Sequence, residues 1–188
     1  MRRVLAQALA AAAIVVVAAA GGAWWWSQPA PVPKALVQSE MPQGFKAVEP
    51  PLQMGDLAFE DGDGKTVRLS DFRGRPVILN IWAKWCAPCV VELPQLNDLQ
   101  AKGGTLAVVA VAVDEPDPTK VRGFLINRGL TALEPYLDPK NVFAKALNIR
   151  SIPVSMLIDK DGYALVRVDA PVHWFGADAV ALLQRTIL

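Results

Sequence analysis

The sequence has little sulfur and almost no histidine: two cysteines and one histidine occur in 188 residues. A structural zinc site normally needs four Cys or His ligands, so a single chain does not supply one. An excess of one charge is also missing, since 19 lysines and arginines stand against 18 aspartates and glutamates. The formal net charge of +1 therefore gives no indication of nucleic acid or another polyanion as a partner.

One long uncharged stretch stands at the N-terminus. Ala8 to Trp26 contains no charged or strongly polar residue, and Arg2-Arg3 precedes it. About 20 apolar residues suffice to span a bilayer, and Trp24-Trp25-Trp26 suits a membrane interface. We expect residues 1–26 to be a membrane anchor that leaves the rest of the chain in a bacterial periplasm, where disulfides persist. A cleaved signal peptide is the alternative, because small residues at 18–23 suit a protease. No cysteine stands directly after the stretch, which excludes a lipoprotein.

Proline is concentrated between the anchor and the rest of the chain. Six prolines lie within residues 27–51, and they predict a semi-rigid linker. Residues 52–188 are predicted to form one domain. Its apolar patterns predict strands over 57–60, 66–69, 77–83, 106–113, 154–158 and 164–168, and helices over 88–102, 119–127, 141–147 and 177–188. This order predicts an α/β fold, with a mixed sheet and helices on both faces.

Both cysteines lie in WCAPC, residues 85–89, where a buried strand meets a helix. A disulfide that closes only two intervening residues restrains the unfolded chain very little, so it would be a poor structural staple. A redox role fits better. The free N–H groups and dipole of the helix start favour an anion at Cys86, which would lower its pKa and make it the attacking thiolate. Cys89 lies one turn further on the same face and can resolve a mixed disulfide.

Few other residues near the cysteines suggest chemistry. Glu92 is either a solvated helix carboxylate or, if buried, a group with a raised pKa that exchanges a proton with the second sulfur. Lys84 either helps a thiolate or is solvated. The lone His173 has no evident partner and receives no catalytic role. Trp174 and Phe175 are interpreted as packing residues.

Several stretches together carry a family resemblance. With WCAPC and the VVELP that follows it, the sequence resembles the thioredoxin-like proteins. It is most similar to the membrane-anchored TlpA-like and ResA-like branch of bacterial thiol–disulfide oxidoreductases. The supporting stretches are DLAFEDGDGKTVRLSDFRGRPVILNIWAKWCAPC, SIPVSMLIDKDG and PVHWFGADAVALL. The resemblance covers about residue 55 to the end. It implies a thioredoxin-like fold with an added N-terminal β-hairpin.

The resemblance also implies the residues of a site. Cys86 would be the nucleophile and Cys89 the resolving thiol, and together they would form the redox disulfide. Pro153 would be cis and face the dithiol, while Ile152 would offer its backbone to an extended substrate peptide. Further contacts to substrate would come from Trp85, Ala87 and Pro88.

Proton handling is where the sequence departs from ordinary thioredoxins. Asn80 stands where those proteins carry a buried aspartate, and an amide does not titrate. Glu92 falls where the TlpA-like and ResA-like branch places an acidic residue near the active site. Proton transfer would therefore fall to Glu92 or to water, and no metal or cofactor is expected.

The resemblance implies an exported, monomeric protein-disulfide reductase. Its clients would be exported proteins whose cysteines must be free to bind haem or copper, as in cytochrome or copper-oxidase assembly. A membrane electron donor of the DsbD/CcdA type would re-reduce the dithiol. Three alternatives stay open: a non-catalytic docking module, a Cu(I)-binding protein, since soft thiolates suit Cu(I), and a dithiol oxidase. Such oxidases usually have a histidine between the cysteines, whereas this chain has Ala87-Pro88.

Overall fold

The computed structural model describes residue 36 and residues 38–186 of the chain. The expected membrane anchor, residues 1–26, lies outside these residues, as does the first part of the expected linker. Among the described residues, no helix is both long and apolar enough to cross a membrane. The anchor therefore stays a prediction.

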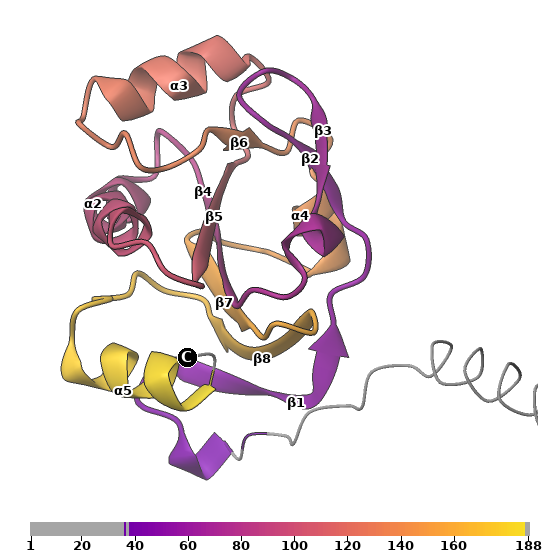
Figure 1. Ribbon diagram of the computed structural model, residues 1–188, viewed down its shortest axis with the longest axis vertical. Coiled ribbons are helices and arrows are strands. Elements are labelled where there is room, and N and C mark those ends of the chain that lie inside the picture. Colours follow the sequence, from indigo (N-terminus) through magenta and orange to yellow (C-terminus); the bar gives the residue numbers. More distant parts are fainter. Residues whose placement is uncertain (1–35, 37, 187–188) are drawn as a thin grey trace, which may run out of the picture. The chain divides into compact units, whose positions relative to one another are not determined.

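A single mixed sheet runs through the described part of the chain (Figure 1). Its eight strands lie in the order β1-β8-β7-β4-β5-β6-β2-β3. β4 is parallel to β5 and antiparallel to β7, so it lies in the interior of the sheet. This arrangement confirms the predicted mixed sheet. The strands are β1 (Phe45–Gln53), β2 (Ala58–Glu60), β3 (Thr66–Arg68), β4 (Val77–Trp82), β5 (Ala107–Ala112), β6 (Tyr136–Leu137), β7 (Val154–Ile158) and β8 (Tyr163–Val168).

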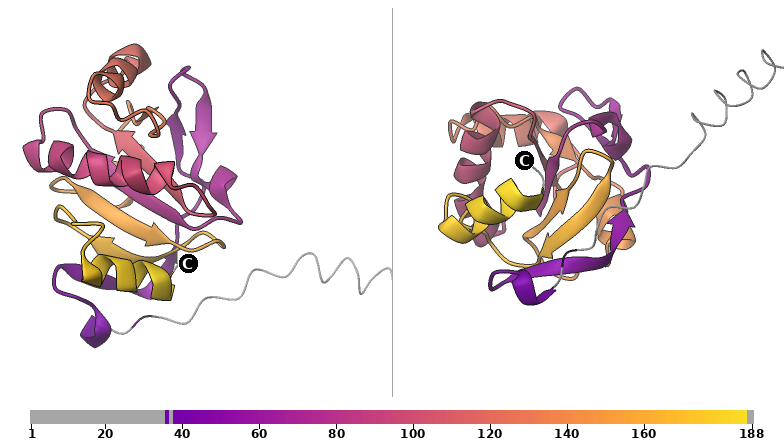
Figure 2. Two further views of the ribbon diagram at one scale, coloured as in Figure 1. Left: turned by 60° about the vertical axis from the view of Figure 1, so that its left-hand side comes forward. Right: turned by 60° about the horizontal axis from the view of Figure 1, so that its bottom comes forward.

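Helices cover both faces of this sheet, as the sequence predicts. The helices are η1 (Gln38–Glu40), η2 (Leu69–Phe72), α2 (Ala87–Ala101), α3 (Pro118–Ile126), α4 (Val142–Ala146) and α5 (Ala177–Thr186). Figures 1 and 2 show α2 and α5 against one face, with α4 on the opposite side. Only residues 83–86 separate β4 from the first turn of α2, so this interior strand positions the start of α2.

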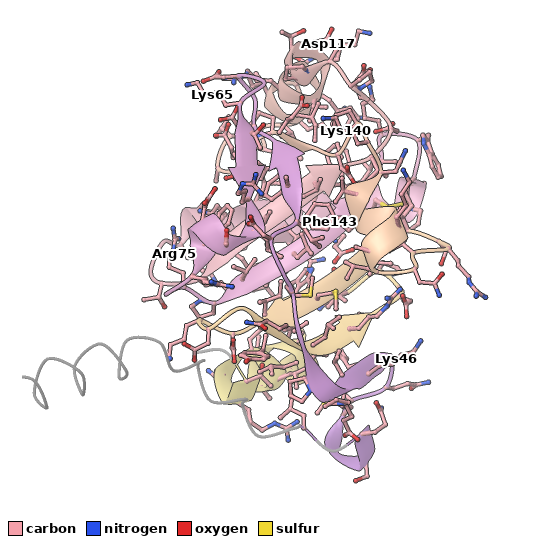
Figure 3. All side chains as sticks on the ribbon, turned by 90° about the vertical axis from the view of Figure 1, so that its right-hand side faces the viewer. Lys46, Lys65, Arg75, Asp117, Lys140 and Phe143 are labelled. Atoms are coloured by element: carbon pink, nitrogen blue, oxygen red, sulfur yellow. A yellow bond between two sulfur atoms is a disulfide. The ribbon has the colours of Figure 1, made fainter. Side chains whose placement is uncertain are left out.

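Two apolar layers fill the space between the sheet and its helices. Ile78 and Trp82 of β4 belong to the layer beneath α2, α3 and α5. Leu79 and Ile81 point to the other face and pack in the layer that includes Phe143 of α4. Figure 3 shows Phe143 over this second face. Successive side chains of a strand point to opposite faces, so a strand covered on both sides is apolar throughout.

The predicted N-terminal hairpin is present and extends one edge of the sheet. β2 and β3 pair in antiparallel fashion, with Ala58 opposite Arg68. The Asp61 carboxylate accepts hydrogen bonds from the N–H groups of Asp63 and Lys65 and so fixes the turn. β2 also pairs with β6. The hairpin therefore lies beyond β6, away from the interior strand β4.

Strand β1 corrects the predicted extent of the linker. The sequence predicts a spacer to residue 51, but residues 45–53 pair with β8 in antiparallel fashion. The register shifts between Ala47 and Leu52, and both Pro50 and Pro51 lie in that interval. Proline is tolerated at sheet edges and bulges because a missing N–H costs nothing there. The folded unit therefore begins well before Leu52.

Smaller differences concern short elements and helix ends. The two-residue strand β6 was not expected, since two residues show no periodicity. α3 begins at Pro118, one residue before the predicted start at Thr119, and its N-cap is Asp117. The Asp117 carboxylate accepts a hydrogen bond from the Thr119 N–H at 2.9 Å. α5 begins at Ala177 as predicted and is described to Thr186.

Candidate active site

The two cysteines form a disulfide at the start of α2. Cys86 is the N-cap residue of this helix, and Pro88 lies in its first turn. Their Cα atoms are 5.3 Å apart. Both residues are nearly covered, with exposed fractions of 3% for Cys86 and 1% for Cys89. Cys86, at the end of the helix, is thus slightly more exposed than Cys89, although both are almost covered.

Two backbone groups contact the sulfur of Cys86. The N–H of Cys89 points to Sγ at 3.3 Å, as expected at a helix start. The carbonyl oxygen of Ile152 lies 3.7 Å from the same sulfur. The Ile152–Pro153 peptide bond is cis, as the resemblance implies. The fold thus brings residues 66 positions apart in the chain to one sulfur atom.

Lys84 is occupied by two acidic neighbours from the loop after β5. Its ammonium lies 2.6 Å from a carboxylate oxygen of Glu115, and this pair is partly buried. Its backbone N–H donates to Asp114 at 3.0 Å. The hydrogen bond from Lys84 is the main cause that lowers the pKa of Glu115. Lys84 therefore joins two loops and offers no free charge to a thiolate.

Glu92 is buried, which decides between the two interpretations of this residue. Only 2% of it is exposed. Burial raises its pKa from 4.5 to about 7, while the Trp174 side chain and the nearby Val172 backbone act in the opposite direction. The indole N–H of Trp174 donates to Oε1 at 2.6 Å. Glu92 lies three residues after Cys89, so the carboxylate and the second sulfur share one face of α2.

Asn80 forms a neutral pair beneath α2. Its amide donates to the hydroxyl of Ser155 at 3.0 Å, and both side chains are buried. Alternation along β4 puts Asn80 on the same face as Ile78 and Trp82, which is the α2 face. The sheet therefore offers no titrating group at this position, in agreement with the expectation from the sequence.

Apolar surface surrounds the entrance to the disulfide. Trp85 is 72% exposed, and Ala87 and Pro88 are also exposed. Next to Trp85 lies a hollow of about 190 Å³, whose apolar lining includes Val113, Ala144, Ile149 and Ile152. Of the residues expected to contact substrate, Trp85 and Ile152 thus line one groove.

A model of the Redoxin family matches residues 38–171, more than half of the chain. The chain belongs to the Redoxin family. Thiol-disulfide oxidoreductase ResA of Bacillus cereus is 31% identical to it over 132 residues, which cover 67% of this chain and 75% of that protein. ResA of Geobacillus kaustophilus is 38% identical over 109 residues, which cover 57% of this chain and 62% of that protein.

Solved structures share the fold of this Redoxin protein. The exposed lipoprotein thioredoxin of Streptococcus pneumoniae has a TM-score of 0.57 at 27% identity, covering 70% of this chain and 97% of that one. A secreted thiol-disulfide isomerase of Corynebacterium glutamicum has a TM-score of 0.61 at 24% identity, covering 80% and 95%. The chain is thus a thiol-disulfide oxidoreductase similar to ResA, with a CxxC active site at Cys86 and Cys89.

The sequence did not indicate the partners of the buried glutamate in this Redoxin protein. Trp174 was expected only to pack, yet it donates a hydrogen bond to Glu92 across 82 positions of sequence. No local pattern pairs residues at that distance. His173, next to it, is exposed. The described residues hold no group of three or more His, Cys, Asp or Glu that could bind a metal ion.

Proposed function

We propose that this oxidoreductase works as a reductase of protein disulfides. The observation that carries the proposal is that neither a histidine between the cysteines nor an unpaired Lys84 adds to what the helix start offers a thiolate at Cys86. Strong dithiol oxidants owe their potential to a stabilised reduced form. Here the Cys86 sulfur has the N–H of Cys89 at 3.3 Å, the nearby Lys84 is paired with Glu115, and no histidine separates the cysteines. Such a site favours the disulfide over the dithiol, and its dithiol is therefore a good electron donor.

The proposed reaction begins with the reduced enzyme and a client disulfide. The Cys86 thiolate attacks one client sulfur, the client S–S bond breaks, and the other client sulfur leaves as a thiolate. Cys89 then gives its proton to the Glu92 carboxylate, and its sulfur attacks Sγ of Cys86. The mixed disulfide breaks and the second client thiolate leaves. Two electrons pass to the client, and the enzyme ends with the Cys86–Cys89 disulfide.

Client recognition is proposed to use the groove beside Trp85. An extended peptide next to Ile152 would bind by main-chain hydrogen bonds, with one apolar side chain in the hollow. This mode gives affinity with little sequence selectivity. It suits clients that share only an accessible disulfide.

The cellular setting is proposed from the resemblance and the N-terminal sequence. We propose that residues 1–26 anchor the protein in a bacterial inner membrane and that the folded domain lies in the periplasm. Clients would be exported proteins with cysteines that bind haem or copper. Electrons would come from a membrane carrier of the DsbD/CcdA type.

The reduction potential of the full chain tests the direction of electron transfer. The protein is equilibrated in dithiothreitol and glutathione buffers, and free thiols are trapped and counted. A potential near or below about −220 mV, in the range of thioredoxin and glutaredoxins, is the expected result. A value near about −120 mV, as in a strong dithiol oxidant, would reverse the proposal.

Replacement of Trp85 by alanine tests the groove. Truncation of an exposed tryptophan at an interface centre typically weakens binding by more than tenfold. We expect Trp85→Ala to lower kcat/KM for a disulfide-containing protein about tenfold, mainly through KM, with the reduction potential unchanged. The matched control is Ile126→Ala, since Ile126 is an exposed apolar residue of α3 outside the groove. Equal losses in the two variants would contradict a binding role for Trp85.

A further inference from the structure

The two carboxylate oxygens of Glu92 have different surroundings. Oε1 accepts the indole N–H of Trp174 at 2.6 Å. Oε2 is buried and has no hydrogen-bond partner among the described residues. An unpaired buried polar atom is costly when it is charged and less so when it carries a proton. The oxygens are therefore not equivalent, and Oε2 is the one left free to exchange a proton.

Trp174 belongs to a segment that contacts α2 at two places. The segment joins β8 to α5, and Trp174 is fully buried within it. The adjacent Phe175 ring lies 4.3 Å from the ammonium of Lys102, at the far end of α2. A backbone hydrogen bond of 2.8 Å from Gly176 to His173 closes the turn. A Cβ at Gly176 would lie 3.0 Å from the His173 carbonyl oxygen, so this turn favours glycine. The indole therefore has a fixed position relative to Glu92.

The geometry points to Trp174 as a positioning residue for proton transfer. We propose that its indole N–H occupies Oε1 of Glu92 and leaves Oε2 as the atom that takes the proton from Cys89. This inference rests on the proposed function, because it names the oxygen of Glu92 that accepts the proton in the reaction described there. A tryptophan needed only for packing would not require this bond: Trp82 packs in the same layer, and its Nε1 is buried without a hydrogen-bond partner among the described residues.

The charged surroundings of Glu92 are simple. From α2, Cys89 is the titrating group nearest along the helix. From the segment before α5 come the Trp174 indole and the Val172 N–H, with His173 exposed beside them. From the sheet, the polar group on this face is the Asn80–Ser155 pair, which does not titrate. No charged side chain is among the causes that shift the pKa of Glu92. Loss of the indole donor should therefore shift the midpoint of the profile of rate against pH.

The test replaces Trp174 by phenylalanine in the full chain. The rate at which the dithiol reduces a small disulfide-bonded peptide is measured from pH 5 to 9. A lost hydrogen bond to a charged group disfavours the carboxylate, so the rising limb assigned to Glu92 should move up by about one pH unit. The rate at pH 7 should fall about fivefold, because the ionised fraction falls from about one half to about one tenth.

Two controls separate positioning from packing. Trp82→Phe removes an indole from the same apolar layer and should leave the midpoint in place. In a Glu92→Gln chain, which lacks the titrating group, the added Trp174→Phe change should not shift the profile further. An unchanged midpoint in Trp174→Phe, with only a lower Tm, would overturn the inference.

Failure of the inference differs from failure of the proposed function. If the Glu92→Gln chain still shows the rising limb in its profile of rate against pH, Glu92 is not the proton acceptor, and the proposed mechanism is wrong. If the rising limb disappears in the Glu92→Gln chain but keeps its midpoint in the Trp174→Phe chain, only the role of Trp174 is wrong. Should Trp174→Phe fail to fold, ¹⁵N-labelled tryptophan in the unaltered chain provides the measurement. The Trp174 indole resonance should then titrate with the midpoint of Glu92, and a pH-independent resonance would contradict the proposal.

Discussion

A chain carrying Cys89→Ser is expected to stay covalently joined to its client, whereas a chain carrying Cys86→Ser is expected to form no such adduct. The reason is the placement of the two sulfurs. Cys86 caps α2 beside the Ile152 carbonyl and the groove, while Cys89 lies one turn further in and is 1% exposed. Without Cys89, the mixed disulfide at Cys86 has no internal thiol to resolve it.

Turnover in either single variant should fall at least about a thousandfold, because each removes a group that forms a covalent bond in the reaction. The adduct is measured by non-reducing electrophoresis and mass spectrometry after incubation with a disulfide-bonded protein. The double variant Cys86→Ser Cys89→Ser gives the background. An adduct through Cys89 in the Cys86→Ser chain would contradict the proposed roles.

The second large effect concerns the pH dependence of stability in a chain carrying Glu92→Gln. The pKa of Glu92 is about 7 in the folded protein, against an ordinary value of 4.5. A raised carboxyl pKa means that the folded state holds the proton more tightly than the unfolded state. The associated stability is fully present below about pH 4.5 and is lost as the pH rises through about 7. A difference of 2.5 units corresponds to about 3 kcal/mol.

Glutamine at position 92 does not titrate, so the variant should lack this loss. Urea unfolding of the oxidised protein at several pH values measures the free energy of unfolding. The difference between the unaltered chain and Glu92→Gln should change by about 3 kcal/mol between pH 4.5 and pH 8, in favour of the variant at high pH. Asp98→Asn, an exposed change on the same helix, should leave the curve unaltered. Parallel curves for Glu92→Gln and the unaltered chain would show that Glu92 has an ordinary pKa.

Local patterns predicted most of the fold and half of the site. The strand before the cysteines and the helix after them are predicted from apolar runs and from the prolines and glycines that end them. These signals are local, because each extends over only a few residues. The disulfide follows for the same reason, since its two sulfurs are three positions apart. β1 escaped prediction because its prolines suggest a linker, and only pairing with β8 makes an edge strand of them.

The other half of the site depends on contacts between distant parts of the chain. The approach of Ile152 to the sulfur was expected only from the family resemblance. Whether Glu92 is solvated or buried was open, because helical periodicity does not say what covers a given face. The answer comes from Trp174, whose indole reaches Glu92 from beyond the last strand. Packing of α5 and its preceding loop against α2 decides this, and no short motif encodes it.

Strand β1 also covers a sheet edge that β8 would otherwise expose to another chain. A free sheet edge exposes unpaired N–H and C=O groups that can recruit another chain. Here β8 is covered by β1, and β1 itself carries Pro50 and Pro51 within an irregular stretch. Neither proline has an N–H to donate, so a second chain could not continue the ladder past them. A soluble fragment that starts at Leu52 would lose this cover and expose β8, so fragments made for crystallisation or assays should begin before Gln38 to resist aggregation.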